Sequence, residues 1–272
     1  MHWITIILCF ISLFEMSVSN IFLRVKDGRN AKDGEFPFVV SFFYTVLVTC
    51  RTNPKPDEIK AIRFCTGSIL SQTWILSAAH CVADETLRTF RVWHTNFTTS
   101  PIGTKYLKSI RKIVIHPAHI DNDYVTQNDI SLILVDKLDV DSLGRLSAVD
   151  HLTMMGLPVT YVGGGVTDDP EDDDIRPLQV GEGGIVPCSK RHGFSKYVIC
   201  VTQRCDNRRQ RPWLGDSGGP LLYAGRIIGV TSFGAVDPVG GVDAFAAVSP
   251  HLDWIRYVME TQALPNFLRN ID

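Results

Sequence analysis

A serine lies in the segment Gly215–Pro220, which reads Gly-Asp-Ser-Gly-Gly-Pro, and its hydroxyl is a candidate nucleophile. Because a serine hydroxyl is weakly nucleophilic at neutral pH, it needs a base to take its proton. His80, in Ala-Ala-His-Cys, and Asp129, in Asn-Asp-Ile-Ser-Leu, precede Ser217 in the chain order His, Asp, Ser. In such a group the imidazole moves the proton, while the carboxylate fixes the tautomer of the ring and stabilises its charged form. His80, Asp129 and Ser217 are therefore the candidate catalytic residues.

The same serine also satisfies the looser pattern Gly-x-Ser-x-Gly, which is typical of the strand-to-helix turn of α/β-hydrolases. That turn must open a helix, whereas Gly-Gly-Pro after Ser217 does not start one. Asp243 and His251 follow the serine in the order that such a fold requires, but the alternation of strands and helices around them is absent. The sequence therefore favours the His-Asp-Ser order.

Short segments rich in Val, Ile and aromatic residues recur along the chain, separated by Gly, Pro, Asn or Asp, and this pattern is typical of an all-β sandwich or barrel. The segments span residues 39–44, 74–77, 90–93, 110–115, 130–135, 198–201, 226–230 and 244–248. Only the C-terminus predicts a clear helix, over about 250–262, with Ser249 as its cap and Pro250 at the first helical position. We expect its apolar face to pack on the last barrel.

The His80, Asp129 and Ser217 segments together resemble those of the trypsin/chymotrypsin-fold serine endopeptidases. Gly34–Phe38, which reads Gly-Glu-Phe-Pro-Phe, and Trp254-Ile255 also resemble landmarks of that family. The resemblance implies an all-β peptidase domain over residues 25–272, made of two antiparallel six-stranded β-barrels with a C-terminal α-helix. The first barrel would span about 25–140 and the second about 155–250, with the active site between them.

The resemblance also assigns backbone roles near the serine. The N–H groups of Gly215 and Ser217 would form the oxyanion hole, which stabilises the charge that develops on the substrate carbonyl. The substrate would be a protein or peptide, and this chemistry requires no organic cofactor and no catalytic metal. An activating trypsin-like protease and protein inhibitors would be further partners.

The N-terminus predicts a signal peptide over residues 1–19. Ile4 to Phe14 is an apolar run of the right length, followed by the small residues Ser17 and Ser19, although Met1-His2-Trp3 has no Lys or Arg. A membrane anchor is the alternative. With the signal peptide removed, we expect a secreted, extracellular protein that has no membrane association in its mature form.

Residues 20–24 would then form a short activation segment. By resemblance, cleavage between Arg24 and Val25 would convert a zymogen to its active form. The new amino group of Val25 would fold inward and pair with Asp216, which orders the oxyanion hole. The alternative is that Arg24 is an ordinary basic residue of the surface.

Six cysteines remain if Cys9 leaves with the signal peptide, an even number that suits disulfides in an oxidising compartment. By resemblance, Cys65 pairs with Cys81 and Cys188 pairs with Cys200. Cys50 and Cys205 have no familiar partners, so they pair with each other, pair with another chain or stay free. The sequence Asn96-Phe97-Thr98 is an N-glycosylation sequon.

The candidate specificity pocket departs from the family. Arg211 aligns with the floor position that is Asp in enzymes that cleave after Lys or Arg, so we expect primary specificity unlike that of trypsin. Three interpretations stay open: Arg211 pairs with Asp243 and the pocket takes a small or medium apolar side chain; Arg211 is free and takes an acidic one; or Arg211 lies in a surface loop. Trp213 replaces a cysteine that the family bridges to the far wall. The other expected pocket residues are Leu214, Ser232 and Gly234.

The net charge and the acidic run give little further information about function. Lys plus Arg total 27 and Asp plus Glu total 29, so the net charge of −2 does not support nucleic-acid binding. The acidic run Asp168–Asp174 lacks the spaced ligands and the glycine of a calcium loop and is interpreted as a solvated loop.

Two functions remain. One is a secreted serine endopeptidase that works through an acyl-enzyme. The other is a catalytically weak or inactive protease-like protein that serves as a binding or regulatory module. The presence of His80, Asp129, Ser217 and Gly215 favours the enzyme, because a binding module has no physical need of all four.

Overall fold

The computed structural model describes Val25 and residues 28–48, 58–83, 90–122, 125–165, 175–188, 196–203, 210–234 and 242–262. The signal peptide, the activation segment with Arg24, Cys50, Cys205 and the acidic run Asp168–Asp174 lie outside these residues.

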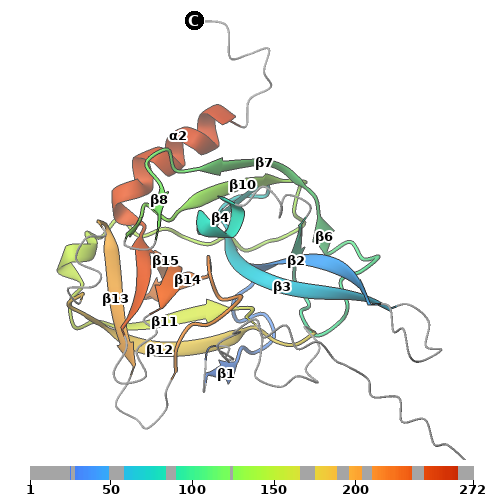
Figure 1. Cartoon of the computed structure of the whole chain (residues 1–272), viewed down its shortest axis with the longest axis horizontal. Helices are drawn as coiled ribbons and strands as arrows, with labels where there is room; N and C mark the ends of the chain where they lie inside the picture. The colour runs from blue at the N-terminus through green and yellow to red at the C-terminus, as the bar shows by residue number, and fades with distance from the viewer. Residues whose placement is uncertain are drawn as a thin grey trace, which may run out of the picture.

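The first sheet forms a barrel, because a bend of the chain joins the strands at its two edges (Figure 1). Its strands run in the order β6-β5-β2-β3-β4-β10-β7, and neighbours pair antiparallel. Because only Ser109 separates β6 from β7, the two outer strands are consecutive pieces of one extended segment, so the sheet forms a barrel of six strand positions. The strands are β2 (Val39–Val48), β3 (Glu58–Ile69), β4 (Trp74–Ser77), β5 (Arg91–His94), β6 (Leu107–Lys108), β7 (Ile110–Ile115) and β10 (Ser131–Val135).

The second sheet closes through a direct pairing of β12 with β13. The strands are β1 (Arg29–Asn30), β11 (Pro158–Gly163), β12 (Gln179–Val186), β13 (Val198–Gln203), β14 (Pro220–Tyr223), β15 (Arg226–Gly234) and β16 (Asp243–Ala247). Six of them make the ring, and β1 is added outside it against β12. The start of the described chain therefore lies on the second barrel, although the expected span placed it with the first.

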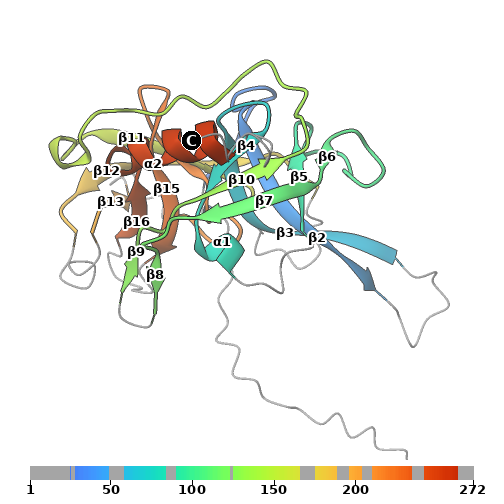
Figure 2. The same cartoon turned by 90° about the horizontal axis from the view of Figure 1, so that it is seen from above.

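Among the described residues helices are few, and the longest is α2 (Leu252–Gln262), which follows the last strand of the second barrel (Figure 2). The others are α1 (His80–Ala83) and the short 3₁₀ turns η2 (His151–Thr153) and η3 (Ser249–His251); a small hairpin of β8 (Ile120–Asp121) and β9 (Thr126–Gln127) stands apart from the barrels. The predicted C-terminal helix is present, but Ser249 does not cap it. Instead, Val248 precedes the 3₁₀ turn without a side-chain cap, and Ser249 Oγ accepts a hydrogen bond from the His151 N–H at 3.2 Å.

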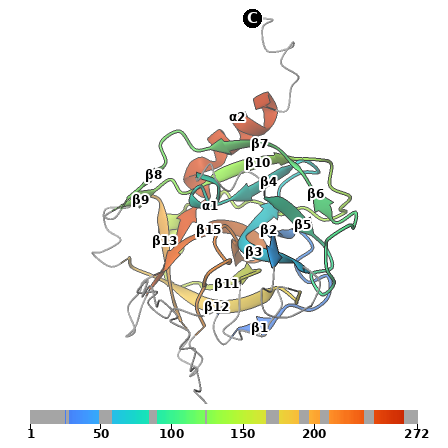
Figure 3. The ribbon, with the colours of Figure 1, turned by 45° about the vertical axis from the view of Figure 1, so that its right-hand side comes forward.

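The helix α2 packs on the first barrel rather than mainly on the last one (Figure 3). Ile255 and Val258 are buried in the larger hydrophobic cluster, which also contains the buried apolar residues of β4 and β10. The ring of Trp254 lies 4.9 Å from that of His116, which directly follows β7. The helix α2 therefore leads from the second barrel back to the first.

The larger of the two hydrophobic clusters spans both barrels. The larger cluster joins Trp74, Ile133 and Phe42 of the first barrel to Val162 and Val230 of the second. Burial of this apolar surface supplies the main driving force that holds the barrels together. Side chains at the interface between the two barrels are thus held in place by packing from both sides.

Candidate active site

His80 and Asp129 meet because their strands pair. Residue Ser77 at the end of β4 is opposite Ser131 at the start of β10, so the residues just beyond these ends come together. The Nδ1 atom of His80 lies 2.7 Å from Asp129 Oδ2, and the backbone N–H of His80 donates to Asp129 Oδ1 at 2.9 Å. Asp129 is 2% exposed. The carboxylate thus fixes both the backbone and the ring of His80.

His80 and Asp129 each stabilise the charged form of the other. Burial lowers the pKa of His80, but the negative charge and the hydrogen bond of Asp129 outweigh it, so the pKa is above its usual value. Burial raises the pKa of Asp129, but the charge and hydrogen bonds of His80, and a hydrogen bond from Ser232, hold it below its usual value. The structure therefore favours an ionised Asp129 beside a basic imidazole.

Ser232 of β15 contributes to this pair from the second barrel. Its Oγ donates to Asp129 Oδ2 at 2.5 Å. The sequence analysis expects Ser232 in the specificity pocket, and the structure adds a contact of its hydroxyl with the carboxylate. No local pattern in the sequence indicated this contact, because it joins residues 103 positions apart.

Ser217 lies in a tight turn that leads into β14. Within this turn the Asp216 N–H donates to Trp213 O, and the Gly219 N–H donates to Asp216 O, both at 2.9 Å. Gly215 and Gly218 have φ values of 88° and 83°, which favour glycine over residues with a side chain. The first and fourth residues of the Gly-Asp-Ser-Gly-Gly pattern are thus required to be glycine by the backbone of the turn.

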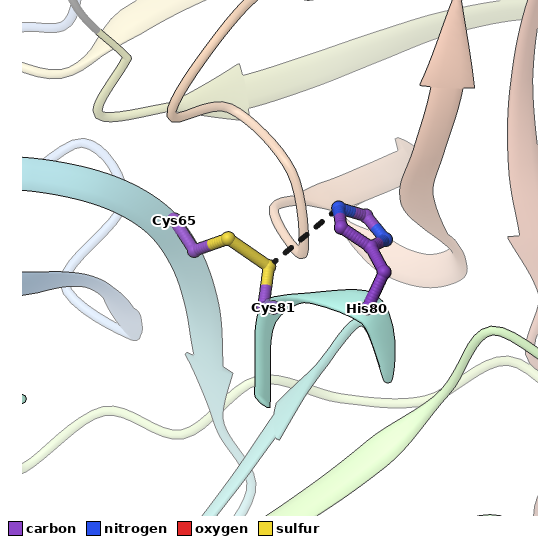
Figure 4. A group of neighbouring side chains, drawn as sticks. All are labelled: Cys65, His80 and Cys81. Atoms are coloured by element: carbon purple, nitrogen blue, oxygen red, sulfur yellow. Dashed lines mark hydrogen bonds between the residues drawn. A yellow bond between two sulfur atoms is a disulfide. The ribbon is translucent and has the colours of Figure 1, made fainter. Parts of the chain in front are cut away.

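A disulfide lies beside the histidine (Figure 4). Cys65 of β3 is bonded to Cys81 of α1, as the resemblance implied. Cys81 Sγ lies 3.9 Å from His80 Nε2 and 3.6 Å from the carbonyl oxygen of Ser217. The far nitrogen of the imidazole and the backbone of Ser217 therefore contact the same sulfur atom.

The same cluster does not make a metal site. Cys65, His80 and Cys81 present ligand atoms within 4.8 Å of one another. However, a cysteine binds a metal as a thiolate, and these two sulfur atoms are bonded to each other at 2.01 Å. The second implied disulfide, Cys188–Cys200, is also present, at 2.05 Å.

Asp216 is buried against backbone donors. Its carboxylate accepts from the N–H groups of Trp213 at 2.8 Å and Gly165 at 2.9 Å, and also from that of Val25. Burial raises the pKa of Asp216 to about 7, although these hydrogen bonds and the charge of Arg176 act in the opposite direction. Val25 itself is fully buried in the smaller hydrophobic cluster.

The space around Asp216 admits only glycine. A Cβ on Gly163 would lie 2.0 Å from Asp216 Oδ1, and one on Gly165 would lie 2.6 Å from it. Gly163 and Gly165, which no motif in the sequence singled out, thus make room for this carboxylate.

The residues of the expected specificity pocket include a buried ion pair. Arg211 Nη2 donates to Asp243 Oδ1 at 3.0 Å, and the two side chains are 15% and 4% exposed. Burial raises the pKa of Asp243 to about 6, while the charge and hydrogen bond of Arg211 lower it. Asp243 is opposite Gly234 in the strand register, and Leu214 is 60% exposed. Of the three interpretations of Arg211, the structure forms the pair with Asp243.

The sequon lies on the surface. Asn96 is exposed in the turn after β5, with φ of 49°, and the Thr98 hydroxyl donates to Asn96 Oδ1 at 3.1 Å. The side chain of Asn96 is therefore open to solvent.

Comparison with known proteins identifies the family. The family model named Trypsin matches residues 25–255. The chain belongs to the trypsin family. It is 30% identical to Brachyurin of Leptuca pugilator over 71% of this chain and 86% of that protein, and 28% identical to Serine protease 1 of Drosophila melanogaster over 86% and 84%. The predicted family is thus confirmed, and these relatives support a serine peptidase.

The fold agrees with this membership. A solved structure of neuropsin, described as a serine protease expressed in the limbic system of mouse brain, matches with a TM-score of 0.66. It is 19% identical and covers 85% of this chain and 98% of its own. The predicted fold of two barrels and a C-terminal helix is therefore confirmed. Among the residues described for this trypsin-family chain, no helix has the length and apolarity that crossing a lipid bilayer requires.

Replacing Gly218 with alanine tests the packing under the serine turn. A Cβ there would lie 2.1 Å from Ser77 Oγ and 2.2 Å from Thr66 O, in addition to the strain of the positive φ. We expect Gly218→Ala to lower the free energy of unfolding by roughly 2–5 kcal/mol, from the sum of backbone strain and overpacking. Chemical denaturation with the disulfides intact measures this loss.

Gly225→Ala is the matched control, because Gly225 has φ of 72° but no atom lies within 4 Å of the position that its Cβ would take. This variant has only the backbone strain, about 1–2 kcal/mol. Equal losses in the two variants would show that close packing under the turn is unimportant.

Proposed function

We propose that the protein is a secreted serine endopeptidase, made as a zymogen, that hydrolyses peptide bonds through Ser217, His80 and Asp129. The observation that carries this proposal is the convergence at Cys81, where the imidazole of the buried His80–Asp129 pair and the backbone of Ser217 contact one sulfur atom. These groups come from both barrels, so the folded chain brings together what the sequence separates.

The first half of the reaction forms an acyl-enzyme. Ser217 Oγ attacks the carbonyl carbon of the peptide bond while its proton moves to His80 Nε2. The negative oxygen of the tetrahedral intermediate is stabilised by the N–H groups of Gly215 and Ser217. Neither N–H donates to a protein acceptor within the described part of the chain, which leaves both for the substrate.

The intermediate then breaks its C–N bond, and His80 gives the proton to the leaving amine. In the second half, water attacks the ester while His80 takes one of its protons, and the carboxylic acid leaves as Ser217 recovers its hydrogen. Asp129 stays ionised throughout and stabilises the charged imidazole, which is consistent with the lowered pKa of this carboxyl.

Activation would follow cleavage between Arg24 and Val25 by a trypsin-like protease. The burial of Val25 and the hydrogen bond from its N–H to Asp216 support this step. A carboxyl group with a pKa of about 7 is only partly ionised at neutral pH. The ammonium group of a new N-terminus would restore its charge, because an adjacent cation favours the carboxylate.

The specificity pocket would take a small or medium apolar side chain. Arg211 and Asp243 neutralise each other at 3.0 Å, so neither charge is left for a substrate side chain. The solvent-exposed Asn96 and the two disulfides suit a glycosylated protein of an oxidising, extracellular compartment. Protein substrates, an activating protease and protein inhibitors are the proposed partners.

Active-site labelling tests the proposal directly. A fluorophosphonate probe should form a bond from Ser217 Oγ to phosphorus, with loss of fluoride, after cleavage at Arg24. Ser217→Ala should abolish labelling and lower kcat on the order of 10⁶-fold. Arg24→Gln, which the activating protease cannot cleave, should label much more slowly. A folded, correctly cleaved protein that does not label would leave only the binding-module function.

The pH profile tests the role of the His80–Asp129 pair. His80 must be neutral to accept the proton, and its pKa is raised, so kcat/KM should fall as the pH drops through a value above 6.5. Asp129→Asn removes the charge that raises this pKa, so the acid limb should move to lower pH, with kcat lower by about 10⁴-fold. An acid limb that stays in place in this variant would contradict the assignment.

Cleavage profiles with a peptide library test the pocket. Arg211→Ser should leave the Asp243 carboxylate alone and shift preference toward Lys or Arg before the scissile bond by about tenfold or more, whereas Asp243→Ala should favour Asp or Glu. The double variant is the control, because it lacks both charges and should keep an apolar preference. Unchanged profiles in both single variants would place Arg211 outside the pocket.

A further inference from the structure

Arg176 is a buried arginine whose guanidinium group lies close to the carboxyl group of Asp216. Its Nη2 atom donates to the carbonyl oxygen of Gly165, and the N–H of the same glycine donates to Asp216 Oδ1 at 2.9 Å. Two hydrogen bonds and the span of one residue from nitrogen to oxygen separate the two groups, which is a distance of at most about 9 Å. A buried cation and a buried carboxyl group thus contact the same glycine.

The Asp216 carboxyl group needs a nearby positive charge in order to ionise. It is buried, and the N–H groups of Trp213, Gly165 and Val25 that donate to it carry no net charge. Burial raises its pKa to about 7, and the charge of Arg176 is among the causes that lower it. Before cleavage Val25 has a peptide N–H rather than an ammonium group, so a positive charge at this stage has to come from a side chain. Arg176 is placed to supply it.

The charge of Arg176 is permanent and close enough to affect this ionisation. A guanidinium group does not lose its proton in a protein. At an effective dielectric constant of about 20, unit charges about 9 Å apart change an ionisation equilibrium by roughly tenfold. Because Asp216 has a pKa of about 7, a change of this size determines whether its ionised form is common or rare at neutral pH.

The ionised form of Asp216 holds the serine turn more firmly than the protonated form. Hydrogen bonds to a charged group are roughly twice as strong as neutral ones, so a carboxylate binds the N–H groups of Trp213 and Gly165 more tightly. Trp213 begins the turn, and Asp216 directly precedes Ser217. Protonation of Asp216 would therefore loosen the backbone that places the nucleophile.

We propose that Arg176 is a positioning residue that keeps Asp216 ionised before cleavage at Arg24, so that the uncleaved chain already has part of the activity of the cleaved enzyme. This inference rests on the proposed function, because it concerns the regulation of the same site. Arg176 acts through Asp216 and touches no reacting atom. After cleavage the ammonium group of Val25 supplies its own charge, and the contribution of Arg176 becomes small.

The test compares one substitution in the uncleaved and cleaved forms of the full chain. Arg24→Gln keeps the chain uncleaved, whereas immobilised trypsin, removed before labelling, cleaves the chain that retains Arg24. In the uncleaved form Arg176→Met should slow fluorophosphonate labelling of Ser217 by roughly tenfold, because the supporting charge is lost. In the cleaved form the same substitution should change the labelling rate by no more than about twofold, since the ammonium group of Val25 is present.

Arg176→Lys is the matched variant, because lysine and methionine both have unbranched side chains but only lysine is charged. It should restore most of the labelling rate of the uncleaved chain. Arg176→Gln, which keeps a donor for Gly165 O without the charge, replaces the methionine variant if that one does not fold, and the same loss is expected. Equal losses in the uncleaved and cleaved forms of a folded variant would show a structural role and overturn the proposal. Equal rates for the charged and uncharged variants in the uncleaved chain would also overturn it.

Two outcomes separate this proposal from the proposed function. An uncleaved Arg24→Gln chain that does not label, beside a cleaved wild type that does, would overturn the role of Arg176 and leave the endopeptidase standing. A wild-type protein that is cleaved but not labelled would overturn both.

Discussion

The geometry of the candidate active site depends on a charged carboxylate, that of Asp129, which is buried in the interior of the protein. Asp129 is almost fully buried, and an ionised group in such a place is stable only when its oxygen atoms are hydrogen-bonded and a cationic partner is near. The backbone and ring of His80 supply bonds from the first barrel, and Ser232 supplies one from the second. The pairing of β4 with β10 and the packing of the two barrels are both needed to collect these donors.

Three buried carboxyl groups near the site differ in what surrounds them. Asp129 has an imidazole beside it, and its pKa is lowered. Asp243 has Arg211, which offsets burial only in part, so its pKa remains at about 6. Asp216 is bonded mainly to backbone N–H groups and has a pKa of about 7. Burial raises the pKa of all three carboxyl groups, and the charged or hydrogen-bonding partner of each one determines its final pKa.

Much of the fold was predictable from the sequence because its signals are local. The strand patterns of Trp74–Ser77 and Ile110–Ile115 match the observed bounds, and the C-terminal helix ends at the expected residue. His80, Asp129 and Ser217 could be selected because each lies in a short motif and their chain order is informative. The family resemblance then implied the Cys65–Cys81 and Cys188–Cys200 disulfides, which are the two among the described residues.

The remaining features depend on contacts between distant residues. The hydrogen bond from Thr66 Oγ1 to Gly215 O spans 149 positions, and the hydroxyl of Ser232 could be placed only when β15 was placed beside Asp129. Ser249 has the residue type of a helix cap, but the nearby His151 N–H offers its hydroxyl another partner. The position of the first described residues on the second barrel follows from the pairing of β1 with β12, which two residues of sequence cannot predict.

The closure of the second sheet also limits how the protein meets its neighbours. A ring whose strands all have partners offers no long row of free backbone groups on which another chain could add a strand. One extra strand, β1, is added to this ring. It is two residues long and contains the exposed, charged Arg29. A short, charged rim of this kind disfavours sheet-to-sheet aggregation, an advantage for a barrel protein at high concentration.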